Sequence, residues 1–165
     1  HQGGSIMYIL VVLNVIGIAL MVTKIFVLGQ QKQKIPETSS LLGQKVKELA
    51  KGKNHEALIE LTKTELSAYM STMEKGLGLI KSIATISPLL GLLGTVVGIL
   101  LSFQVISATG LMNPANFAEG ISLALITTVG GMIVAIPHYL GHNYITSSLD
   151  QLEVNLEKEL LNKVL

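Results

Sequence analysis

Three long stretches of this chain carry no lysine, arginine, aspartate or glutamate: His1–Thr23, Ser82–Ala118 and Gly120–Leu149. Apolar runs of about 20 residues or more are long enough to cross a bilayer as a helix. The pattern therefore predicts an all-α membrane protein with three transmembrane helices, over residues 1–29, 82–108 and 117–145. No strand-like alternation interrupts these runs.

Charge is concentrated between the first and second predicted spans. Ten of the twelve lysines lie from Lys24 to Lys81, whereas the connector between the second and third spans, Ser107–Ala118, contains none. Cytoplasmic loops carry the excess of positive charge in membrane proteins. We therefore expect residues 30–81 in the cytoplasm, a short outer loop at 109–116, the N-terminus outside, and a cytoplasmic C-terminal helix at 146–165.

Within residues 30–81, Pro36 and the cluster Thr38–Ser40 indicate a turn before a short helix at Leu41–Lys51. Gly52 is typical of the end of that helix, and Asn54 of the N-cap of the next. From there, apolar and then small residues keep one helical phase without a loop signal. The pattern predicts one continuous helix over about 55–107, whose first half extends into the cytoplasm.

The third span is expected to begin near Asn113 and Pro114, because proline favours the first helical turn. It runs through Pro137 and continues past the membrane as a long helix. An apolar stripe follows on its tail beside acidic residues, formed by Leu149, Leu152, Leu156 and Leu160. We expect this amphipathic tail to pack against the Leu58–Ile80 region.

Composition narrows the classes of function. Hydrophobic residues make up 49% and charged residues 14% of the chain, and there is no cysteine. A soluble enzyme, a secreted disulfide scaffold and a disordered tail are therefore not expected, and the lack of cysteine excludes iron–sulfur clusters. No catalytic motif, cofactor fingerprint or nucleic-acid-binding pattern is present. His138 and His142 have the spacing of a helical metal pair, but without further ligands we expect a structural or interfacial role and no metal.

Two stripes of small and hydroxyl residues recur every three or four positions on the second and third spans. Glycine and alanine at such spacing favour close helix packing in lipid. Each threonine or serine can either bond a carbonyl one turn back in its own helix or line a narrow polar path. The candidate packing residues are Gly91, Gly94, Gly98, Gly120, Ala124 and Gly131, and the candidate path residues are Thr95, Thr128, Thr127, Ser87 and Ser102.

Neither of these spans has a carboxylate or a lysine in its middle. A proton path needs a titratable carrier, which a hydroxyl group is not at physiological pH. The chain alone is therefore not expected to translocate protons, unless a partner supplies the acid. Glu119 lies at the outer end of the third span, where it serves either to complement the helix dipole or to line an outer mouth.

The segment SPLLGLLGTVVGI at Ser87–Ile99 resembles the second-span signature of the ExbB/TolQ/MotA proton-channel family. The segment GISLALITTVGGMIVAIP at Gly120–Pro137 resembles its third-span signature. The likeness is specific over about residues 82–145 and is most similar to the ExbB branch. Where many relatives have a glutamate four residues before the first threonine of the third span, this chain has Leu123.

This resemblance implies a homo-oligomeric ring, pentameric in the family, in the bacterial inner membrane with its N-terminus in the periplasm. It implies an ExbD-type single-span partner that supplies a membrane aspartate, and a TonB-type protein that receives the energy of the proton motive force. By position, Thr95 and Thr128 match the family's pore threonines. A TolQ-like role in envelope maintenance and a passive membrane scaffold are the alternatives.

Overall fold

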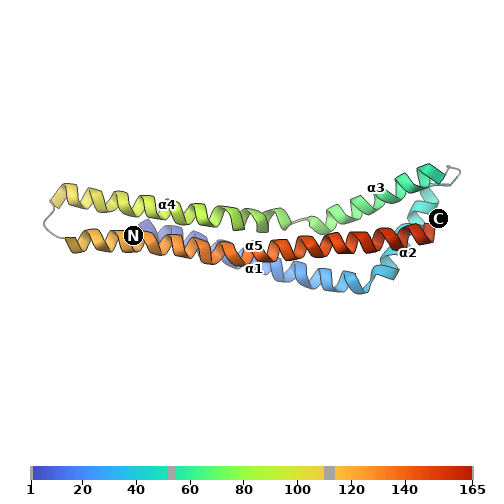
Figure 1. The fold of residues 1–165 in the computed structure, drawn as a ribbon, viewed down its shortest axis with the longest axis horizontal. Coiled ribbons are helices and arrows are strands. Elements are labelled where there is room, and N and C mark those ends of the chain that lie inside the picture. The colour runs from blue at the N-terminus through green and yellow to red at the C-terminus, as the bar shows by residue number, and fades with distance from the viewer. Residues whose placement is uncertain (1, 52–54, 110–113, 165) are drawn as a thin grey trace. The chain divides into compact units, whose positions relative to one another are not determined.

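The computed structural model describes residues 2–51, 55–109 and 114–164, and all of its regular structure is helical. The helices are α1 (Gln2–Gln33), α2 (Ile35–Leu49), α3 (His55–Glu74), α4 (Leu77–Thr109) and α5 (Pro114–Val164). Three segments are long and apolar enough to cross a membrane: Ser5–Gln33, Leu77–Ser107 and Gly120–Val164. The expected all-α fold, with three helices long and apolar enough to span a membrane, is therefore confirmed (Figure 1).

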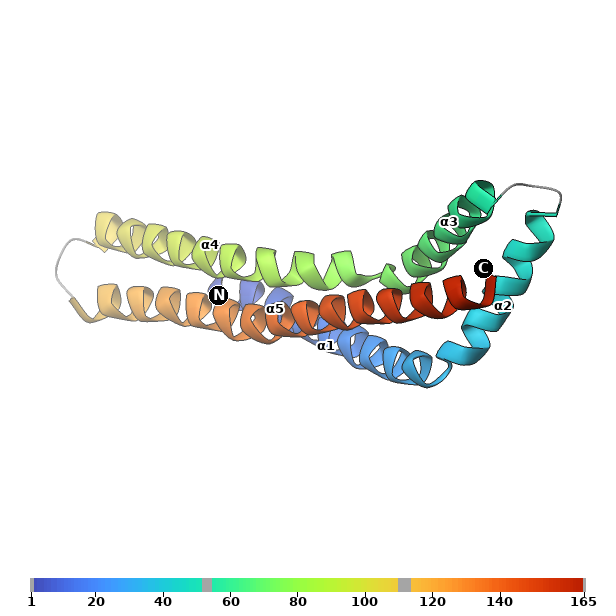
Figure 2. The ribbon, with the colours of Figure 1, turned by 45° about the vertical axis from the view of Figure 1, so that its right-hand side comes forward.

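The chain divides into two compact units, which we describe separately. The first, here the apolar unit, comprises His1–Met21 and Leu79–His142, and the second, here the charged unit, comprises Val22–Gly78 and Asn143–Leu165. In the apolar unit, α4 and the first half of α5 run side by side in opposite directions, as Figures 1 and 2 both show. A small core of Leu10, Ile83 and Val134 joins α1, α4 and α5 there.

The predicted continuous helix over 55–107 is wrong, because the chain breaks between α3 and α4. Gly76 has a φ of +91°, a left-handed conformation that glycine adopts at the ends of helices. Lys24 of α1 donates from Nζ to the carbonyl oxygen of Met73 at 2.8 Å, which satisfies a carbonyl that the ended helix leaves free. Long-range capping of this kind leaves no periodic signal in the sequence.

The helix α2 also differs from its prediction, since it begins at Ile35 rather than at Leu41. Pro36 lies in its first turn, where the missing N–H costs nothing, and therefore starts the helix instead of preceding it. Ser39, predicted to be part of a turn, is buried in α2 and donates to the carbonyl of Pro36 at 3.0 Å. Gly52 and Asn54 lie outside the described residues, as does Asn113.

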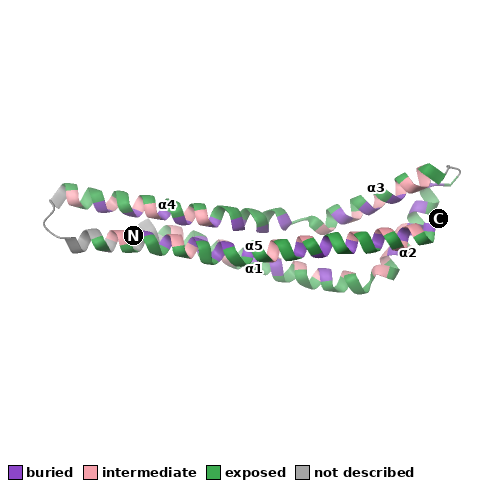
Figure 3. Ribbon diagram, in the orientation of Figure 1, coloured by how far each residue is buried: buried purple, intermediate pink, exposed green. Residues whose placement is uncertain are grey.

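In the charged unit, the end of α5 packs against α2, and Leu149, further back in α5, lines one small cavity with Met73 at the end of α3. Leu149, Leu152, Leu156 and Leu160 are each at most 3% exposed, which confirms the predicted apolar face (Figure 3). Leu160 and Val164 lie within 4 Å of the space beside Gly43 of α2. The predicted partner was the Leu58–Ile80 region alone, whereas α2 shares this role.

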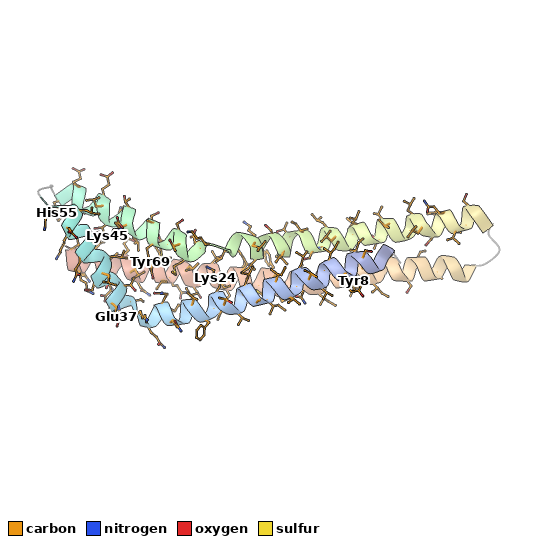
Figure 4. All side chains as sticks on the ribbon, turned by 180° about the vertical axis from the view of Figure 1, so that it is seen from behind. Tyr8, Lys24, Glu37, Lys45, His55 and Tyr69 are labelled. Atoms are coloured by element: carbon orange, nitrogen blue, oxygen red, sulfur yellow. The ribbon has the colours of Figure 1, made fainter. Side chains whose placement is uncertain are left out.

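Polar contacts complete the charged unit, and Figure 4 labels two of the side chains involved, Lys45 and Tyr69. Lys163 at the end of α5 donates to the carbonyl of Pro36 at 2.9 Å and to Oγ of Ser39 at 2.8 Å. Lys45 of α2 pairs with Glu65 of α3 at 2.6 Å. Tyr69 of α3 donates to the side chain of Gln31 in α1 at 2.9 Å. These bonds tie α1, α2, α3 and the tail of α5 together.

Candidate functional site

The candidate packing glycines lie at the contact between α4 and α5. A Cβ added to Gly91 would lie 2.9 Å from the carbonyl oxygen of Thr127 and 2.9 Å from Cα of Thr128. A Cβ on Gly131 would lie 2.5 Å from the carbonyl oxygen of Ser87. These neighbours are backbone atoms, which cannot rotate away. The two helices therefore approach as closely as they do because these positions have no side chain.

The rest of the small-residue stripe pairs across the same contact. Gly94 faces the side chain of Thr127, and Gly120 faces the hydroxyl of Ser102. A Cβ on Gly98 would lie 2.8 Å from Cβ of Ala124. All six candidate packing residues thus lie between α4 and α5, with small residues opposite one another or opposite a hydroxyl.

Four of the five candidate path hydroxyls have a carbonyl partner in their own helix. On α4, Ser87 donates to Ile83 at 2.7 Å, Thr95 to Leu92 at 2.7 Å and Ser102 to Gly98 at 2.9 Å. On α5, Thr127 lies 2.6 Å from the carbonyl of Ala124 and 3.3 Å from that of Gly91. The single proton of Thr127 is therefore best placed on the carbonyl of Ala124.

Thr128 directs its hydroxyl proton to the other helix rather than to its own. Its Oγ1 donates to the carbonyl oxygen of Gly91 at 3.1 Å. Because a carbonyl only accepts, the proton of Thr128 points at α4 and its lone pairs point away from that bond. Thr128 therefore offers an acceptor to any further polar group that approaches it.

Burial separates the five hydroxyls into two groups. Ser87, Ser102 and Thr127 are at most 4% exposed inside the single chain. Thr95 and Thr128 are half-buried, and so retain surface for another molecule. The side chain of Glu119 lies outside the described residues, and it is the only carboxylate in the sequence of the apolar unit. The apolar unit thus presents hydroxyl acceptors among apolar side chains.

Known proteins match this chain over the part that contains the site. The model of the MotA/TolQ/ExbB proton channel family matches residues 31–158, which include α4 and most of α5. The chain belongs to the MotA/TolQ/ExbB proton channel family. The match includes every candidate packing and path residue named above.

Individual relatives carry the ExbB name. The chain is 41% identical over 95 residues to a protein named as an ExbB homologue in Methanothermobacter thermautotrophicus, which covers 56% of this chain and 33% of that protein. It is 40% identical over 86 residues to biopolymer transport protein exbB1 of Vibrio cholerae, with 52% and 38% covered. For biopolymer transport protein ExbB of Aquifex aeolicus the values are 39% over 101 residues, with 59% and 68% covered.

The first two relatives are thus matched over only 33% and 38% of their length. Family membership makes this chain a multi-pass protein of the inner membrane and of a proton-channel family rather than of a catalytic one. Among the described residues, no group of three His, Asp or Glu side chains is placed to hold a metal ion.

A second packing contact of this ExbB-like chain, which the sequence pattern did not predict, joins α1 and α5. Gly130 receives the side chain of Met7, and Gly141 receives that of Met21. In the opposite sense, Gly17 of α1 receives the ring of His138. Each glycine pairs with a large residue on the other helix, so the faces of α1 and α5 that meet here carry no stripe of small residues. A search for repeated small residues does not detect this contact, because each glycine faces a methionine or a histidine.

Proposed function

We propose that this chain is an ExbB-like subunit of an inner-membrane proton-channel motor. In this proposal it works with an ExbD-type partner and uses the proton motive force to energise TonB-dependent transport across the outer membrane. The observation that carries the proposal is the pair Thr95 and Thr128. Both keep exposed surface, and both hydroxyl protons are directed at backbone carbonyls.

A helix surface that carries these two hydroxyl groups accepts hydrogen bonds but has no group that holds a proton. Its hydroxyl lone pairs favour a group that donates, such as a protonated carboxyl or water, and provide no donor for a carboxylate. The sequence of α4 and of α5 up to His142 contains one carboxylate, Glu119, near the start of α5. The proposal therefore assigns the proton-carrying acid to the partner's membrane helix, and assigns Thr95 and Thr128 to its immediate surroundings.

The three enclosed hydroxyls receive a different role. Ser87, Ser102 and Thr127 are buried within one chain, so a path between this chain and a partner does not reach them. We assign them to helix packing, since each satisfies its donor within the α4–α5 contact. Glu119 stays a candidate for the outer mouth.

The assembly proposed is a homo-oligomeric ring, pentameric as in the family, around the partner's helix. The large exposed apolar side chains of α4 and α5 support it, because they need lipid or neighbouring subunits around them. The lysine-rich residues 24–81 support a cytoplasmic charged segment, a periplasmic N-terminus and a cytoplasmic C-terminus.

Reconstitution tests the proposal. The chain is purified alone and together with the ExbD-type protein of its source organism, and each preparation is placed in vesicles that contain a pH-sensitive dye. We expect the homomer to remain tight to protons and the complex to conduct when a membrane potential is applied. A variant partner whose membrane aspartate is replaced by asparagine should be tight. Proton conduction by the homomer alone, or a homomer whose centre is filled by its own side chains, would contradict the motor and favour a scaffold.

A further inference from the structure

His138 is a fully buried titratable residue in the apolar unit, and the proposed proton path does not use it. Its side chain is 0% exposed, on the part of α5 that faces α1. Its Nδ1 lies 2.7 Å from the carbonyl oxygen of Val134, one turn back in α5. Because a carbonyl cannot donate, Nδ1 must carry the hydrogen of this bond. In a neutral ring, Nε2 is then a bare acceptor.

The bare nitrogen meets the backbone of α1. Among the described residues, Nε2 of His138 is a buried atom without a hydrogen-bond partner. A Cβ added to Gly17 would overlap Nε2 and Cδ2 of this ring, and would lie 3.1 Å from Cδ1 of Ile83 in α4. A Cα hydrogen of Gly17 therefore faces the lone pair, a contact that is weakly favourable.

A proton added to Nε2 would change this contact. The new N–H would point at a Cα–H group that cannot accept a hydrogen bond, in the space that α1 already fills. A buried donor without an acceptor is costly, and a buried charge without a partner more so. The α1 helix therefore fits against His138 only while Nε2 is bare.

Among the described side chains of the three helices in this unit, none supplies a counter-ion. In the part of α1 that belongs to the apolar unit, the titratable side chain among the described residues is that of Tyr8, which is exposed. On α4 the titratable residue is Lys81, an exposed cation near Ile83. On α5, Tyr139 is exposed and His142 is half-buried one turn on. Glu119 lies 19 positions away along the sequence of α5.

We propose that Nε2 of His138 is a proton-binding site whose occupation and the seating of α1 on α5 exclude each other. The proton comes from a hydronium ion: the lone pair of Nε2 forms the N–H bond as an O–H bond breaks, the electron pair of that O–H bond stays on oxygen, and a water molecule is released. Binding requires α1 to move so that Gly17 no longer contacts the ring of His138, and this movement exposes Nε2. The position of α1 thereby reports the local proton concentration. This site lies within one chain, so its test does not depend on the ExbD-type partner or on the proposed function.

A reversible lock on α1 tests the exclusion. The chain has no cysteine, so two can be introduced without background. Cγ of Met21, where a cysteine would place its sulfur, lies 3.5 Å from the position of a Cβ on Gly141. The double variant M21C/G141C should therefore form a disulfide that holds α1 against α5, and a reducing agent should release it.

Nitrogen NMR of histidine-labelled protein in lipid nanodiscs reads the ring directly. His138→Gln identifies the signal of His138, and the exposed His55 serves as the internal reference. In the oxidised, locked protein we expect His138 to keep the Nδ1–H neutral form at a pH where the reduced protein carries a proton on Nε2. After reduction we expect Nε2 to bind a proton on acidification. Identical titration in both states, or titration in neither, would overturn the proposal.

The rate of disulfide formation gives the reciprocal test. In the reduced double variant, this rate should fall several-fold more on acidification than in the same variant carrying His138→Gln, which corrects for the ionisation of the thiols. His142→Gln is the matched control and should leave the acid effect in place. An acid effect that survives His138→Gln unchanged would assign it to another group and contradict the role of His138.

A second variant removes the contact between Gly17 and the ring of His138. Gly17→Ala places a methyl group where Nε2 lies, whereas Gly29→Ala makes the same change in α1 at a position with nothing within 4 Å. In the oxidised M21C/G141C background we expect the ring of His138 to bind a proton on acidification in Gly17→Ala and to stay neutral in Gly29→Ala. If His138 stays neutral in Gly17→Ala, the contact with α1 does not control its proton.

Discussion

Thr128 and Thr95 are joined through one carbonyl group, that of Gly91. Oγ1 of Thr128 donates to this oxygen from α5 at 3.1 Å. Thr95 follows Gly91 by four residues within α4, so its backbone N–H is directed at the same oxygen by helix geometry. The half-buried hydroxyls of the proposed path are therefore fixed relative to each other by the backbone of a single glycine.

This bond predicts that Thr128→Val separates folding from function. Valine keeps the shape of threonine but removes the acceptor that Thr128 offers. Hydrogen bonds between membrane helices contribute on average about 0.6 kcal/mol and at most about 1.7 kcal/mol, so the variant should fold and assemble. In the reconstituted complex its proton flux should fall to the level of the homomer.

Thr85→Val is the matched control for this variant. Thr85 is exposed on α4 and donates to Lys81 of its own helix at 2.9 Å, away from the α4–α5 contact. It should conduct as wild type does. Equal loss of flux in Thr85→Val, or wild-type flux in Thr128→Val, would remove Thr128 from the path.

Gly91→Ala should destabilise the α4–α5 contact, because the added methyl group meets the backbone of Thr127 and Thr128. Overpacking of this kind costs about 1–3 kcal/mol. Gly29→Ala has open space and should be neutral or slightly stabilising. Thermal unfolding of both variants in detergent, followed by circular dichroism, measures the difference. Equal midpoints would show that the helices separate at Gly91 without cost.

The apolar elements were predictable from the sequence because their signal is strong and local. Long runs without charge identified the three membrane helices, and the leucines at Leu149–Leu160 identified the buried face of the tail. The small-residue stripes on α4 and α5 lie at the contact between these helices. Repeated spacing within one helix is enough to detect such features.

Features that depend on two distant segments were not predictable in this way. The break after α3 depends on Lys24, 49 residues before Met73 in the sequence. The contact between Gly17 and His138 depends on a large residue facing a small one on another helix. The division of the hydroxyls into buried and half-buried groups also depends on which faces meet. Each of these follows from tertiary packing rather than from the pattern along one helix.

The break between α3 and α4 predicts opposite effects for two neighbouring glycines. Gly76→Ala forces alanine into a left-handed conformation, at a cost of about 1–2 kcal/mol. Gly78→Ala lies in the first turn of α4 with nothing within 4 Å of the added Cβ, and should stabilise by up to about 1 kcal/mol. The free energy of unfolding of each variant, measured with denaturant, decides the matter. Stabilisation by both changes would instead indicate the continuous helix.

The lysine that caps α3 predicts a local effect on backbone exchange. Lys24→Met keeps a long apolar stem but removes the charged donor to the carbonyl of Met73. A cation at a helix C-terminus contributes about 0.3–1 kcal/mol, so amide exchange in the last turn of α3 should quicken by up to roughly fivefold. Lys24→Arg retains a donor and should restore most of the protection. Lys32→Met removes an exposed charge from the same helix and should change nothing at α3. Amide exchange in the last turn of α3 can be measured by mass spectrometry. If it is the same in Lys24→Met and Lys32→Met, α3 ends at Glu74 because of Gly76 alone.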